Sequence, residues 1–88
     1  MRKKASELAS DKLGLPKELI MNIPKLSIAG NKELFLENYQ NIVEYTDRII
    51  RIKTKDYVVR ITGEYLKITQ MDADNLFAKG DFREISFE

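Results

Sequence analysis

The sequence has no cysteine, no histidine and no tryptophan. Without cysteine there is no disulfide, no thiolate metal site and no cysteine nucleophile, and without histidine the commonest general base is also missing. No apolar run approaches the roughly 20 residues that a membrane-spanning helix requires. These absences exclude several classes of enzyme and of metal site, and they are compatible with a cytoplasmic protein.

The chain also has almost no excess of one sign of charge over the other. The chain carries 15 lysines and arginines against 14 aspartates and glutamates, for a net charge of +1. A nearly neutral chain has no strong overall field to attract nucleic acid or anionic lipid. Its 88 residues, of which 43% are hydrophobic, fit a single domain with one small core.

Residues 1–23 have the pattern of a short helical segment. Ala5, Leu8, Ala9 and Leu13 recur at nearly helical spacing, and Pro16 suits the first turn of a second helical stretch. The segment predicts an amphipathic helix that packs on the rest of the protein or on a partner. Docking on an anionic membrane surface is the alternative, and it would use the basic residues Arg2, Lys3, Lys4, Lys12 and Lys17.

Residues 24–88 change to a period of two and predict an all-β region. Apolar residues alternate with polar ones in short stretches, each bounded by turn-forming residues, which is typical of half-buried strands. About eight short strands are expected. Their apolar pairs are Leu26/Ile28, Leu34/Leu36, Val43/Tyr45, Ile50/Ile52, Val59/Ile61, Leu66/Ile68, Leu76/Ala78 and Ile85/Phe87.

A repeat underlies these strands. Gly30, Asp47, Gly63 and Gly80 each follow an apolar pair by two positions, and they are 17, 16 and 17 residues apart. The pattern predicts tight turns that need a positive φ, with aspartate replacing glycine once. Two architectures explain a period of 16–17 residues: a small β-solenoid of stacked units, or an antiparallel meander that curls into a small sandwich or barrel.

Two charged groups suggest binding sites, and each has a simpler interpretation. Asp72, Asp74, Asp81 and Glu84 could hold a hard cation, but the pattern lacks the glycine and the glutamate of a calcium loop and favours solvated turn residues, so no metal is expected. Arg48, Arg51, Lys53, Lys55 and Arg60, with Tyr45 and Tyr57 nearby, could bind single-stranded nucleic acid. Interleaved acidic residues instead favour cross-strand charge pairs, so no nucleic-acid partner is expected.

Catalysis is not indicated. No serine has a histidine to activate it, and no glycine-rich phosphate loop is present, so neither an enzyme nor a cofactor nor a small-molecule substrate is expected. A protein partner is expected instead. Four apolar residues have the parity opposite to the core pattern and are candidates for that contact, or for the second face of a two-layer core: Phe35, Ile49, Val58 and Phe77.

The chain also resembles a known family. The segments "LGLPKELIMN", "VVRITGEYLKI" and "KGDFREISFE" are similar to the YabP/YqfC family of sporulation proteins, and most similar to its YqfC branch. Particular marks are Leu-Gly-Leu-Pro at 13–16, Gly30-Asn31, Glu37-Asn38-Tyr39 and Glu44-Tyr45-Thr46. None of these motifs is catalytic, and the family brings no established site residues.

The resemblance implies a non-enzymatic protein of the mother-cell cytoplasm, acting in coat or cortex assembly at the forespore surface. It implies an association with the membrane protein YqfD. Self-association through a sheet edge is the other partner that we expect, from the strand pattern alone. The sequence-based alternative is a peripheral membrane adaptor that docks through residues 1–23.

Overall fold

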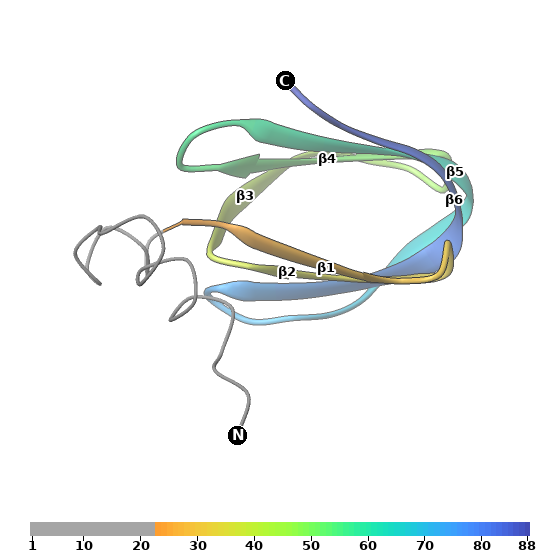
Figure 1. Cartoon of the computed structure of the whole chain (residues 1–88), viewed down its shortest axis with the longest axis horizontal. Coiled ribbons are helices and arrows are strands. Elements are labelled where there is room, and N and C mark those ends of the chain that lie inside the picture. Colours follow the sequence, from red (N-terminus) through yellow and green to blue (C-terminus); the bar gives the residue numbers. More distant parts are fainter. Residues whose placement is uncertain (1–22) are drawn as a thin grey trace, which may run out of the picture.

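The computed structural model describes residues 23–88, which form six strands in one antiparallel sheet (Figure 1). The strand order across the sheet is β1-β2-β6-β5-β4-β3, and every neighbouring pair is antiparallel. The strands are β1 (Lys25–Ala29), β2 (Glu33–Glu37), β3 (Tyr39–Tyr45), β4 (Ile49–Thr54), β5 (Val58–Met71) and β6 (Asn75–Phe87). The helical segment predicted at residues 1–23 lies outside the described residues, except for Ile23.

The sheet folds over on itself because its two longest strands bend. The first layer contains β3, β4, the N-terminal half of β5 and the C-terminal half of β6. The second layer contains β1, β2, the N-terminal half of β6 and the C-terminal half of β5. Figure 1 shows the two layers facing each other, with the bends of β5 and β6 together at one end. The result is a two-layer sandwich made from one continuous sheet.

The core lies between the layers and follows the alternation of the sequence. Its residues come from both layers, and each fully buried aliphatic side chain contributes about 1.5–3 kcal/mol to stability. The buried apolar residues are Leu34, Leu36, Tyr39, Ile50, Ile52, Val59, Ile61, Leu66, Leu76, Ala78 and Phe82.

The bends require close contact between backbones. A Cβ atom at Gly63 would lie 2.0 Å from the carbonyl oxygen of Asp81, on the neighbouring strand. One at Gly80 would lie 2.8 Å from the carbonyl oxygen of Tyr65, and Gly80 also has a φ of +151°. Only glycine lets the two strands approach this closely while they bend.

The hairpin turns are hydrogen-bonded to these bends. In the β3–β4 turn, the carbonyl oxygens of Arg48 and Asp47 accept from the amides of Gly63 (3.1 Å) and Leu66 (2.9 Å). In the β1–β2 turn, the carbonyl oxygens of Lys32 and Asn31 accept from the amides of Gly80 (3.0 Å) and Phe82 (2.9 Å). The repeat of 16–17 residues therefore places first two turns, at Gly30 and Asp47, and then two bends, at Gly63 and Gly80, at the same end of the sandwich.

These observations correct part of the sequence-based prediction. The described chain has the antiparallel arrangement, and its pairs show no parallel stacking of repeat units. Six strands replace the eight expected because Gly63 and Gly80 lie inside strands instead of ending them. A positive φ occurs at Gly30 and Gly80 but not at Gly63 or Asp47. Asp47 forms part of the β3–β4 turn without the left-handed conformation predicted for it.

The first prediction concerns Gly63. Gly63→Ala should lower the free energy of unfolding by about 3 kcal/mol or more, because the added Cβ meets the backbone and cannot move away. Gly30→Ala is the control, since its Cβ meets nothing within 4 Å and only its φ of +57° is unfavourable. That variant should lose only about 1 kcal/mol. Urea unfolding followed by circular dichroism measures both, and equal losses would contradict the close-approach explanation.

The second prediction concerns the β5–β6 hairpin. The Asp72 carboxylate accepts hydrogen bonds from the amides of Asp74 and Asn75, both at 2.8 Å. These bonds lower the pKa of Asp72 below its ordinary value. A depressed pKa gives stability that is fully present above the unfolded-state pKa of about 3.9 and is lost as the pH falls through the folded-state pKa.

Asp72→Asn keeps an oxygen acceptor but cannot titrate. The melting temperature of the unmodified protein should therefore fall further than that of D72N between neutral pH and about pH 2. Thermal melts across this range provide the measurement. Parallel curves would show that the carboxylate does not stabilise the turn.

Candidate protein-interaction surface

Two phenylalanines form a stacked pair on the outer face of the second layer. Phe35 of β2 and Phe77 of β6 are direct cross-strand neighbours, with ring centroids 4.3 Å apart and an angle of 12° between the rings. Phe77 is 40% exposed, and Phe35 is half-buried. Both side chains point away from the core because Leu34, Leu36, Leu76 and Ala78, at the alternate positions, point into it.

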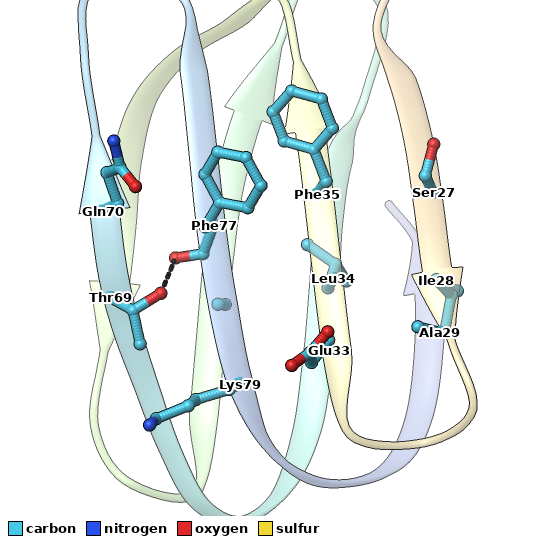
Figure 2. Close-up of a pocket in the computed structure, with 11 residues that line it drawn as sticks. Ser27, Ile28, Ala29, Glu33, Leu34, Phe35, Thr69, Gln70, Phe77 and Lys79 are labelled. Carbon is cyan, nitrogen blue, oxygen red and sulfur yellow. Dashed lines mark hydrogen bonds between the residues drawn. The ribbon is translucent and has the colours of Figure 1, made fainter.

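An open hollow of about 340 Å³ surrounds this pair. Figure 2 shows the rings with polar side chains from neighbouring strands around them, and the Thr69 hydroxyl donates to the carbonyl oxygen of Phe77 at 3.5 Å. We call this surface the phenylalanine face. Its outward-facing residues, by the registers of the strands, are Ser27, Ala29, Glu33, Phe35, Gln70, Phe77 and Lys79, with Thr69 beside them at the irregularity of β5.

The rim of the phenylalanine face carries charges of both signs. Lys79 is flanked across the strands by Glu33 on one side and by Lys67 on the other. At the far end of β2, the Lys25 ammonium lies 3.6 Å from the Glu37 carboxylate. An apolar centre with a mixed polar rim is the composition typical of a protein-binding surface.

The other two predicted contact residues lie elsewhere. Ile49 of β4 and Val58 of β5 belong to the first layer, and both have the parity opposite to the buried Ile50 and Val59. Both are half-buried on the outer face of that layer. The structure therefore brings Phe35 and Phe77 together and places Ile49 and Val58 on the opposite side of the sandwich.

Charge pairs cover the outer face of the first layer. Arg51 lies 2.7 Å from Glu88 and 3.5 Å from Glu44, and Arg60 lies 3.6 Å from Glu84 and 3.7 Å from Glu88. The hydrogen bond between Arg51 and Glu88 raises the pKa of Arg51 and lowers the pKa of Glu88. Two of the five cations considered for nucleic-acid binding are thus engaged with carboxylates, as cross-strand pairing predicts.

The acidic group predicted from the sequence does not converge. Asp72 and Asp74 lie in the β5–β6 turn, Asp81 contacts the Lys32 ammonium, and Glu84 pairs with Arg60. Within residues 23–88, no three aspartates or glutamates lie close enough together to hold a metal ion.

Sequence reasoning missed Tyr65. This residue has a φ of +57°, a conformation that a bulky side chain rarely adopts, and it is 75% exposed at the bend of β5. Its carbonyl oxygen lies only 2.8 Å from the position that a Cβ of Gly80 would take, so the backbone of Tyr65 is closely packed at the bend. In the sequence Tyr65 resembles any aromatic strand residue, and no local signal marks it.

No curated protein and no solved structure matches the chain. In the part that the structure describes, no helix is both long and apolar enough to cross a membrane. The sequence model of the YabP family matches residues 22–88, which include every strand of the sandwich. The chain therefore belongs to the YabP family, as the resemblance predicted.

Proposed function

We propose that this chain is a non-enzymatic sporulation protein that acts as an assembly module in the mother cell during formation of the endospore coat or cortex. Membership of the YabP family supports the connection with sporulation. The phenylalanine face supports a role in binding another protein, because it exposes an aromatic pair at the centre of a polar rim. The single observation that carries the proposal is this exposed pair.

The position of the phenylalanine pair favours contact with a partner protein over packing within the domain. Phe35 and Phe77 lie outside the two-layer core, so neither is needed to fill it. Exposed aromatic rings near the centre of a surface are the residues that most often dominate the affinity of a protein interface. The expected partner is a protein, with the membrane protein YqfD as the first candidate if the chain belongs to the YqfC branch.

The geometry also favours a rigid contact. Phe35 is the middle residue of β2 and Phe77 lies near the start of β6, and the pair is fixed by the register of these two strands. A surface carried by paired strands loses little conformational entropy when a partner binds. The phenylalanine face therefore suits a stable assembly contact.

The third prediction tests this function in sporulating cells. A strain that lacks the gene should form defective spores, and a tagged copy of the unmodified protein should surround the forespore. The double variant Phe35→Ser, Phe77→Ser should lose this localisation and fail to restore sporulation, because it removes both rings from the partner contact.

Val43→Ser provides the control. Val43 is 49% exposed on β3, away from the phenylalanine face, so this variant should localise and complement normally. Circular dichroism must show that both purified variants are folded. Normal spores in the deletion strain, or full complementation by the folded double variant, would contradict the proposal.

A further inference from the structure

The outer edge of β1 is suited to pairing with another strand. β1 pairs with β2 along all five of its residues without a bulge, and no strand within residues 23–88 pairs with its other edge. Such an edge presents a row of backbone N–H and C=O groups that is a template for an added strand.

Two of the other sheet edges are less suitable. β3, at the opposite end of the sheet, has register shifts between Tyr39 and Asn41 and between Ile42 and Glu44. Bulges of this kind twist an edge and hinder further pairing. On the C-terminal half of β5, the amide of Ile68 already donates to the Tyr45 hydroxyl at 2.9 Å.

The core-facing side of β1 is incompletely covered. Ile28 is the cross-strand neighbour of Leu34 and points to the same side, yet Ile28 is 49% exposed while Leu34 is 2% exposed. Leu26, opposite the fully buried Leu36, is only half-buried. A strand added beside β1 would cover both side chains if it carried apolar residues in the matching positions.

β1 itself has those residues in those positions. In an antiparallel pair of two β1 strands centred on Ser27, Leu26 lies opposite Ile28 of the second copy, and Ile28 lies opposite its Leu26. On the outer side Lys25 lies opposite Ala29, so no like charges face each other. The sequence is thus self-complementary about a two-fold axis, the commonest symmetry of protein dimers.

We propose that two copies of this chain pair through β1 in this register and form one continuous sheet across the dimer. The two-fold axis of an antiparallel strand pair is perpendicular to the sheet, so both phenylalanine faces lie on the same side. The dimer would therefore offer an assembly partner two linked binding sites. This role of the dimer rests on the proposed function.

The fourth prediction uses the absence of cysteine from the chain. In the proposed register Ser27 faces Ser27 of the second copy, with Cα atoms about 4.5–5.5 Å apart, which is within reach of a disulfide. Full-length Ser27→Cys should therefore become a covalent dimer on mild oxidation, as non-reducing electrophoresis would show.

Lys25→Cys is the matched control on the same strand. In this register its two copies lie about 14 Å apart, so it should form little covalent dimer under the same oxidation. Equal cross-linking of S27C and K25C, or no cross-linking of S27C, would overturn the register.

Sedimentation of the full-length chain tests the dimer without cysteines. The unmodified protein should be dimeric at a protein concentration of about 100 µM, which is well above a dissociation constant in the micromolar range. Ile28→Lys should weaken association at least about tenfold, because a charge on an edge strand opposes pairing. Val43→Lys, at a position equally exposed on the other edge strand, should leave it unchanged.

A monomeric unmodified protein, or equal behaviour of I28K and V43K, would contradict the dimer. Neither result would affect the assembly role, because the Phe35 and Phe77 double variant tests that role separately. Conversely, a dimer through β1 in a chain whose double variant sporulates normally would retain the β1 pairing but remove the proposed function, and with it the role of two linked binding sites.

Discussion

The close approach of β5 and β6 at their bends is the constraint on which the rest of the structure depends. Gly63 has no room for a Cβ beside the Asp81 carbonyl, and Gly80 has none beside Tyr65. Because both strands bend at the same end, a single sheet forms two layers and encloses its own core. Without the bends, the same strands would expose one apolar face of a flat sheet to solvent.

The bends also determine what the surface presents. Once the core-facing positions are enclosed, the alternate positions of β2 and β6 point outward, and Phe35 and Phe77 meet there as neighbours. The same folding leaves β1 at an edge of the second layer, with Ile28 only partly covered. Both proposed contacts, the phenylalanine face and the β1 edge, are consequences of one folded sheet.

Much of this could be predicted from the sequence, because the alternation of inward and outward residues does not depend on the strand order. It failed in β3, where the register shifts leave the expected pair Val43 and Tyr45 exposed. The alternation correctly placed Leu34, Leu36, Ile50 and Ile52 inside, and the YabP resemblance was confirmed. Whether a glycine ends a strand or bends it depends on how near the neighbouring strand lies, and the sequence does not contain that distance. For the same reason it could not show that Phe35 and Phe77 share a face while Ile49 and Val58 lie on another.

Native-state hydrogen exchange tests the central claim most directly, since it reports how each amide opens. The amides of Gly63, Leu66, Gly80 and Phe82 bind carbonyl oxygens in the two hairpin turns at the bent end. If the bends hold the fold together, these four amides should exchange only through global unfolding, with protection equal to that of the central core strands. Exchange of these amides through local opening, while the core strands remain protected, would contradict the account.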